Sequence, residues 1–269
     1  MPYEWLIDGI AETWSKTESL LSSISESDLD RPTPCPGWSV RDVVSHLIGF
    51  ELMLAGVPAP ELPGEVPDHV RNDIGKMNEA FVYERRDRSQ SEMLEEFREV
   101  TRATLLRLQG LDQAAWELVG WSPEGQAPYH RFMETRILDS WIHLQDLRDA
   151  LALPEDDHGI GEEIVINRFE AALPYVIGKK AQAPEGSRVR VNLEGRVGRS
   201  VEIVIQDGRA RAAEGPGEPN LEISTPVALF WRRTAGRISG EAFLQATETH
   251  VQGDRQLAQR IADALAIMI

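Results

Sequence analysis

The chain has 269 residues, 42% of them hydrophobic, and a formal net charge of −16 at pH 7. This length allows one large domain or two of ordinary size, and the negative charge argues against nucleic acid or anionic membranes as partners. The single cysteine, Cys35, excludes an internal disulfide and suits a reducing cytosol. Because the acidic N-terminus lacks the pattern of a secretory signal and no apolar stretch could span a bilayer, we expect a soluble cytoplasmic protein.

The N-terminal part of the chain begins with two amphipathic helices. From Glu4 to Ile24, apolar residues recur at three- and four-residue steps, which is typical of a helix with one buried face. The prolines and glycine of "DRPTPCPGW" end this helical pattern. Ser39 is a suitable N-cap for a second helix, which we expect to end near Gly56.

Further helical segments follow a proline-rich loop. Helical periodicity returns near Val70, and Ser89 with Glu92 predicts a capping box before the next helix. The segments 130–151 and 161–177 complete the series. Several amphipathic helices joined by loops indicate a helix bundle over residues 1–180.

The character of the sequence changes after "GKKAQAPEGS". Polar and apolar residues alternate in "RVRVNL" and in parts of "SVEIVI", as in half-buried strands. Asp207 and Gly208 predict a hairpin turn, and "LEIS" predicts another strand. Thr225 and Pro226 are interpreted as the N-cap and first-turn proline of a helix, and a last helix ends the chain. We therefore predict a small α+β domain over residues 181–269.

The helix at 130–151 carries a pair of candidate metal ligands. Asp139 and His143 are spaced i, i+4, which places both side chains on one face about one turn apart. His46 lies on the apolar face of the second helix, so packing of the two helices would bring the three together as a metal site. Two imidazoles and one carboxylate are a ligand set of catalytic zinc sites. A lone buried histidine is, however, more often simply hydrogen-bonded in a core, and Asp139 could be a solvated carboxylate.

Neighbouring side chains have less direct interpretations. Glu51 follows His46 by five residues and points about 140° away around the helix, so it is left out of the ligand set. Asp146 could orient the ring of His143 or pair with an arginine. Cys35 is a rival nucleophile, but its place in the proline-rich turn predicts that it is too far from His46 to share a metal and is structural.

Two motifs resemble one known family. "TPCPGWSVRDVVSHLIGFELMLAG" and "DSWIHLQDLRDAL" are similar to the N-terminal signature and the second ligand motif of the mycothiol-dependent maleylpyruvate isomerase family. The resemblance implies a DinB-like four-helix bundle followed by a sterol-carrier-like α+β domain, an α plus α+β fold class. It also implies metal ligation by His46, Asp139 and His143. Family members typically carry glutamate where this chain has Asp139.

The resemblance further implies a reaction. A divalent metal, zinc first, would bind mycothiol as a thiolate for cis-trans isomerisation of a small unsaturated acid or for transfer of the thiol to an electrophile. The partners would then be a small electrophile and a low-molecular-weight thiol. Arg237, in a region that the family places opposite the metal, is the candidate for gripping a substrate carboxylate, although it could equally be a surface charge.

Two other classes of function stay open. The chain could be a non-catalytic small-molecule-binding protein whose metal is structural or absent and whose C-terminal domain holds an apolar ligand. A two-histidine-one-carboxylate iron oxygenase shares the ligand types, but the helical setting and the family signature argue against it. The sequence does not reveal the oligomeric state.

Overall fold

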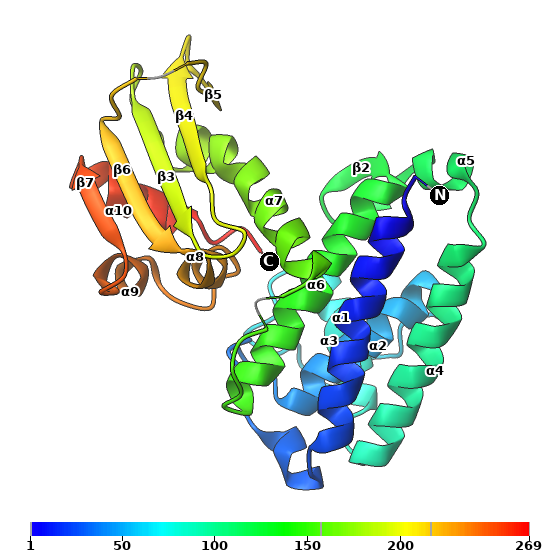
Figure 1. Cartoon of the computed structure of the whole chain (residues 1–269). Helices are drawn as coiled ribbons and strands as arrows, with labels where there is room; N and C mark the ends of the chain where they lie inside the picture. Colours follow the sequence, from blue (N-terminus) through cyan, green and yellow to red (C-terminus); the bar gives the residue numbers. More distant parts are fainter. Residues whose placement is uncertain (1, 157, 216, 269) are drawn as a thin grey trace. The chain divides into compact units, whose positions relative to one another are not determined.

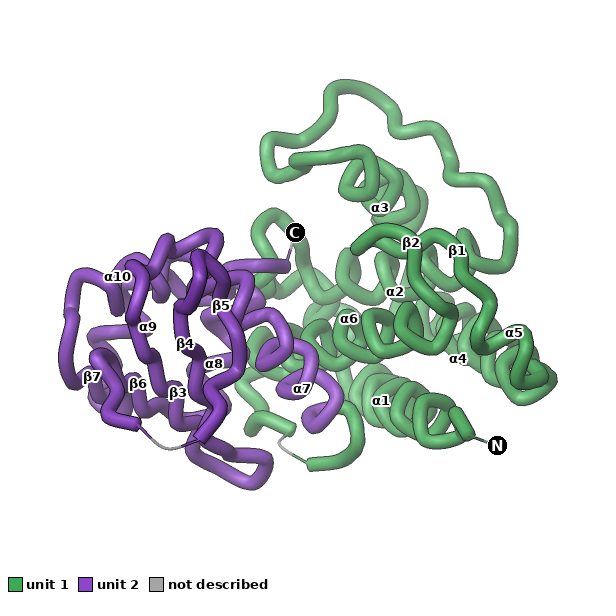
Figure 2. Tube along the Cα trace, turned by 90° about the horizontal axis from the view of Figure 1, so that it is seen from above, with its two compact units in different colours: residues 1–161 green, residues 162–269 purple. Residues whose placement is uncertain are grey.

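The computed structural model describes residues 2–156, 158–215 and 217–268. The chain divides into two compact units, residues 1–161 and 162–269 (Figure 2). The division lies near the start of helix α7 (Ile160–Pro174), so α7 belongs largely to the second unit. The domain boundary between residues 180 and 181 stays a prediction. Within the described residues, none of the helices combines the length and the apolar character needed to cross a membrane.

The first unit is built on a four-helix bundle, as predicted. Helix α1 packs against α4 and α6, and helix α2 packs against the same two helices (Figure 1). The predicted N-caps are confirmed: the hydroxyls of Ser39 and Ser89 each accept a hydrogen bond from the backbone N–H three residues later, and both form capping boxes. The bundle helices are α1 (Glu4–Ser23), α2 (Val40–Leu54), α4 (Gln90–Gln109) and α6 (Tyr129–Ala150).

A shorter helix, α3 (Asp73–Glu84), packs against α2 in the same unit. The close approach depends on Gly49, because a Cβ atom there would lie 2.3 Å from the Cβ atom of Phe81. Some short elements were not expected from the sequence. They are the 3-10 turn η1 (Glu26–Asp30), the helix α5 (Gln113–Glu117), and a hairpin of β1 (Val119–Ser122) and β2 (Gly125–Pro128).

The second unit contains a mixed sheet with the strand order β5-β4-β3-β6-β7. Strand β3 pairs antiparallel with β4 and parallel with β6. The predicted alternation is confirmed in β3, where Val189, Val191 and Leu193 are buried and the residues between them are half-buried. The predicted turn at Asp207 and Gly208 joins β4 to β5. The strands are β3 (Arg188–Glu194), β4 (Ser200–Gln206), β5 (Arg209–Ala212), β6 (Leu221–Pro226) and β7 (His250–Gly253).

Helices cover the apolar side of this sheet. Helix α7 continues into a π-helical segment, η2 (Tyr175–Lys180), which packs against β5 and α10. Helix α8 packs on β3 and β6, and α10 packs on β6 and β7. The remaining bounds are α8 (Val227–Thr234), α9 (Gly240–Gln245) and α10 (Arg255–Ala264).

The expected cap at Thr225 is wrong. Thr225 is a buried residue of β6, and its hydroxyl hydrogen-bonds to the hydroxyl of Thr249 at 2.9 Å. The N-cap position of α8 belongs to Pro226 instead, one residue later than predicted. Pairing with β3 extends through Pro226, so the strand occupies the residues that the sequence pattern assigns to the helix start.

Candidate metal centre

The three predicted ligands lie together where α2 meets α6. The Nε2 atom of His46 is 3.1 Å from Oδ2 of Asp139, and the Nε2 atom of His143 is 3.6 Å from Oδ1 of the same carboxylate. The imidazole rings are 4.9 Å apart between centroids in an edge-to-face arrangement. One ligand atom from each residue lies within 4.8 Å of the other two, which is close enough for a shared metal ion.

The local structure of each helix explains this convergence. The capping box at Ser39 and Asp42 fixes the start of α2, and His46 follows one turn later on its buried side. Asp139 and His143 are one turn apart on α6, as the i, i+4 spacing predicts. The imidazoles are almost fully buried, whereas the Asp139 side chain is 28% exposed. The centre therefore opens to solvent on the side of the carboxylate.

His143 has a second buried carboxylate behind it. Its Nδ1 atom lies 3.0 Å from Oδ2 of Asp146, whose side chain is completely buried. A carboxylate on the far nitrogen is the usual partner of a metal-binding histidine, because it fixes the tautomer that leaves Nε2 available as a ligand. This contact decides between the two interpretations of Asp146 in favour of ring orientation.

His46 is held by a hydrogen bond between its Nε2 atom and Asp139 and by packing of its ring. Its Nδ1 atom is buried and has no hydrogen-bond partner among the described residues. The ring instead lies beside Trp38 and Phe50, with centroid distances of 5.1 Å and 6.1 Å. Trp38 also contacts the ring of His143 at 6.0 Å. Aromatic side chains therefore pack against both imidazoles.

Cys35 is closer to the centre than the sequence suggests. Its Sγ atom and ligand atoms of His143 and Asp146 all lie within 4.8 Å of one another. The sequence argument considered only the distance from His46 along the chain and missed that the turn before α2 reaches α6. Among the described residues, the candidate metal-binding groups that include Cys35 contain His143 and Asp146 but neither His46 nor Asp139.

Glu51 is occupied elsewhere, in agreement with its exclusion from the ligand set. It forms a buried ion pair with Arg136, with Nε of the arginine 3.2 Å from Oε1, and accepts a hydrogen bond from Thr104 at 3.1 Å. Burial alone would lower the pKa of Arg136, but Glu51 and Tyr129 raise it above its ordinary value. This pair ties α2 to α6 beside the candidate ligands.

Arg237 and two neighbouring arginines have different local contacts. Arg233 is buried and donates to backbone oxygens of Ala262, Ile238 and Asp263, so it is structural. Arg232 lies over the Trp231 ring at 4.4 Å. Arg237 is half-buried and follows Gly236, which has a φ of 75° and lies two residues after the last residue of α8. Its role as a carboxylate-binding residue stays a prediction.

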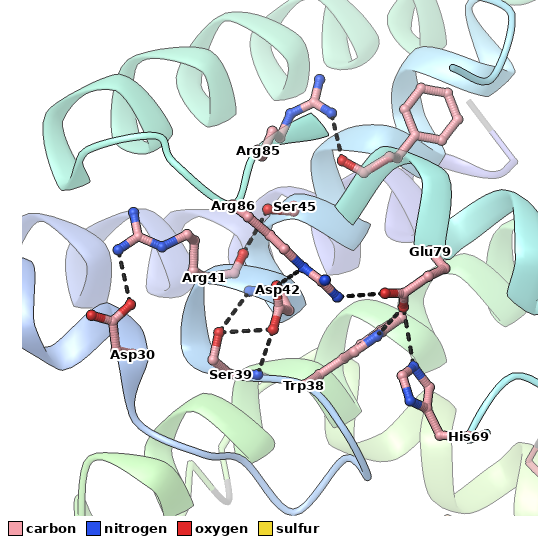
Figure 3. A network of polar contacts seen from close by, with 11 residues as sticks. Asp30, Trp38, Ser39, Arg41, Asp42, Ser45, His69, Glu79, Arg85 and Arg86 are labelled. Carbon is pink, nitrogen blue, oxygen red and sulfur yellow. Dashed lines mark hydrogen bonds and ion pairs between the residues drawn. The ribbon is translucent and has the colours of Figure 1, made fainter. Parts of the chain in front are cut away.

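Sequence reasoning missed one further group around Trp38. The indole Nε1 atom donates to Glu79 of α3 at 3.0 Å, and Glu79 also contacts His69 and Arg86 (Figure 3). No local sequence pattern predicts this cluster, because its members come from separate segments of the chain. The one available signal was the glutamate itself, which stands among the apolar residues of an amphipathic helix.

Comparisons with known proteins agree with the fold and the motifs. The family described as "Mycothiol maleylpyruvate isomerase N-terminal domain" matches residues 10–148. A crystal structure of the mycothiol-dependent maleylpyruvate isomerase is 16% identical, with a TM-score of 0.61, and the match covers 94% of this chain and 93% of that one.

Two other solved structures are similar to this chain. A mutant of the same isomerase, with one histidine replaced by alanine, is 16% identical with a TM-score of 0.56, over 88% of this chain and 90% of that one. The apo form of sterol carrier protein 2 from Yarrowia lipolytica is 13% identical with a TM-score of 0.29, over 38% of this chain and 88% of that one. The comparison with curated proteins gave no match.

Proposed function

The chain belongs to the mycothiol maleylpyruvate isomerase N-terminal domain family, and from this premise we propose that it is a divalent-metal-dependent and mycothiol-dependent enzyme. Its reaction is the isomerisation of a small unsaturated acid or the transfer of the thiol to a small electrophile. The observation that carries the proposal is the convergence of His46, Asp139 and His143 within 4.8 Å. Members of a family can differ in substrate, so the acid or electrophile is left at the level of its chemical class.

The donor set fits a metal ion. Two imidazole nitrogens and one carboxylate oxygen suit zinc and leave a fourth position for a ligand from solution. Asp146 on Nδ1 of His143 supplies the outer hydrogen bond that such sites use. When bound, the metal supplies a charge that keeps a coordinated thiol deprotonated and therefore nucleophilic.

The surrounding side chains have distinct tasks in this proposal. His46 and His143 each present Nε2 toward Asp139, and the carboxylate offsets the positive charge of the ion. Trp38 and Phe50 shield the imidazole of His46 from water, which strengthens electrostatic interactions at the centre. The partly exposed edge at Asp139 is the side from which a thiol and an electrophile would enter.

Arg237 is our candidate for binding the carboxylate of the substrate. A guanidinium group forms paired hydrogen bonds to a carboxylate and stays charged at neutral pH. Replacement of Arg237 by Gln should therefore raise KM for an acidic substrate and leave the metal content close to that of the parent. Unchanged KM would remove Arg237 from the proposal and leave the metal centre in place.

The first test is metal content, measured by plasma mass spectrometry on the tag-free chain. The parent should carry close to one equivalent of zinc or another divalent metal, and both His46→Ala and His143→Ala should lose it while remaining folded. His250→Ala, which removes an exposed histidine of β7, is the matched control and should keep the metal.

Activity is the second test. The metal-loaded parent should isomerise maleylpyruvate or consume a small electrophile only when mycothiol is present. A parent that cannot be loaded with metal would overturn the metalloenzyme proposal. A loaded parent without thiol-dependent turnover would overturn the reaction while keeping the metal site.

A further inference from the structure

The cluster around Glu79 has features that helix packing alone does not require. The Glu79 side chain is 1% exposed, although an ionised carboxylate is costly to bury. Its Oε2 atom lies 3.0 Å from Trp38 Nε1 and 3.1 Å from His69 Nε2, and its Oε1 atom lies 2.5 Å from Arg86 Nη2 (Figure 3). One buried group thus joins the turn before α2, the loop before α3 and the residue two positions after α3.

Helix α3 has a separate ion pair that anchors its C-terminal end. Arg85 is 3% exposed and donates through Nε and Nη2 to both carboxylate oxygens of Glu96 on α4, at 2.9 Å and 2.6 Å. Its Nη1 atom also donates to the backbone oxygen of Phe81. Because this ion pair already attaches α3 to the bundle, the Glu79 contacts can serve a role other than that attachment.

The partner of Glu79 that faces the candidate metal centre is Trp38. The indole ring lies against the imidazoles of both His46 and His143. Its single N–H group donates to Glu79, so this hydrogen bond fixes the rotation of the ring about its side chain. The Nε2 atom of His46 is hydrogen-bonded to Asp139, and its Nδ1 atom has no partner among the described residues, so packing against Trp38 is a second restraint on ring orientation.

The backbone that carries Trp38 is also held in place. The backbone N–H of Thr33 donates to the carbonyl oxygen of Trp38 at 3.0 Å. The backbone N–H of Trp38 donates to the carbonyl oxygen of Cys35 at 3.2 Å. Gly37 has a φ of 81°, and a Cβ atom at this position would lie 2.4 Å from Nδ1 of His69. The turn is therefore tight, and the His69 ring, itself bonded to Glu79, packs directly on it.

We propose that Glu79 is a positioning residue of the candidate metal centre and that it acts through Trp38. It holds the indole ring against the imidazoles of His46 and His143, which keeps their Nε2 atoms directed at Asp139. The inference rests on the proposed metal binding. It adds a residue of α3 to a centre whose ligands come from α2 and α6.

The test uses Co²⁺ alone as the probe, because its visible absorption depends on the number and geometry of its ligands. Glu79→Met keeps the length of the side chain but removes both acceptor oxygens, and Trp38→Phe keeps a ring but removes the N–H donor. Each variant should lower Co²⁺ affinity about 3- to 10-fold and change the Co²⁺ spectrum. The double variant should be no weaker than Trp38→Phe, because Glu79 acts through the missing N–H group.

Glu96→Gln is the matched control. It removes a carboxylate from a buried arginine at the end of α3 without touching Trp38, so it should lower the unfolding temperature while leaving Co²⁺ affinity and spectrum unchanged. Unchanged affinity in Glu79→Met, or losses that add in the double variant, would overturn the inference and leave the metal centre standing. A parent that takes up no Co²⁺ would overturn both proposals.

Discussion

His143 and Asp146 form a buried imidazole–carboxylate pair on one face of α6, with 3.0 Å between Nδ1 and Oδ2. The spacing of three residues brings the groups together within a single helical turn. The pair directs the other ring nitrogen of His143 toward Asp139 at 3.6 Å. A carboxylate on each side of the ring is the arrangement expected when one is a fellow ligand and the other sets the tautomer.

Asp146→Asn should weaken metal binding without abolishing it. Asparagine keeps the size of the side chain but is a poorer acceptor for the Nδ1–H group, so the ring becomes a weaker and less well-oriented donor. We expect metal affinity to fall by about 10- to 100-fold, measured by competition with a chelating indicator. Asp149→Asn, which removes the same charge three residues further along α6, is the control and should bind like the parent. Equal affinities in both variants would show that Asp146 has only a packing role.

Substitutions at Asp139 should separate the effect of the negative charge on metal binding from the effect of side-chain length. Asp139→Glu adds a methylene group and introduces the glutamate that is typical of the family at this position. The variant should therefore retain one metal equivalent and show a shifted Co²⁺ spectrum. Asp139→Asn removes the anionic donor and should bind much more weakly, because a negatively charged carboxylate oxygen attracts a divalent cation more strongly than a neutral amide oxygen does. Binding by the asparagine variant as tight as by the parent would exclude this carboxylate as a ligand.

Glu51→Gln should destabilise the first unit strongly. The substitution leaves Arg136 buried without a counter-charge, and breaking a buried ion pair from one side costs about 3–5 kcal/mol. The expected loss is measured as the free energy of unfolding in urea. Adding Arg136→Met to Glu51→Gln should recover much of it, because the uncompensated charge is then removed. A single variant as stable as the parent would contradict this account of the pair.

The start of α4 should contribute to the loss of stability in acid. Hydrogen bonds from the Ser89 hydroxyl and backbone hold the pKa of Glu92 below its ordinary value of 4.5. A lowered pKa in the folded chain gives stability that is present above the unfolded pKa and is lost as the pH falls through the folded value. Glu92→Gln should therefore lose less stability than the parent between about pH 5 and pH 3.

Urea midpoints measured across that pH range check this expectation. Glu95→Gln, at an exposed position of the same helix, is the control and should follow the parent curve. If the Glu92→Gln curve has the same slope as the parent, the capping box does not contribute to the pH dependence.

The convergence of His46, Asp139 and His143 could be predicted because most of its geometry is local. Asp139 and His143 share a face for any helix over this segment, and the apolar neighbours of His46 place it on a buried face. The bundle and the alternating strands were predictable for the same reason, since periodicity of 3.6 or 2 residues is read directly from the sequence. Metal identity, mycothiol use and cytoplasmic location stay predictions.

What could not be predicted depends on contacts between distant segments. Cys35 meets His143 only because the turn before α2 folds onto α6. Glu79 reaches Trp38 across 41 residues, and no spacing rule connects them. The error at Thr225 has the same origin: a threonine before a proline is typical of a helix start, but pairing of β6 with β3 overrides that local preference.

The candidate ligands lie on two different helices, α2 and α6, and this would have a consequence for folding. His46 and Asp139 are 93 residues apart in the chain, so an unfolded chain would have to close a long loop to offer both to one ion. A divalent cation would therefore select the docked state of these two helices over every open one, and its binding free energy would add to the stability of that state. Metal availability would then set the lifetime of the folded bundle as well as its chemistry.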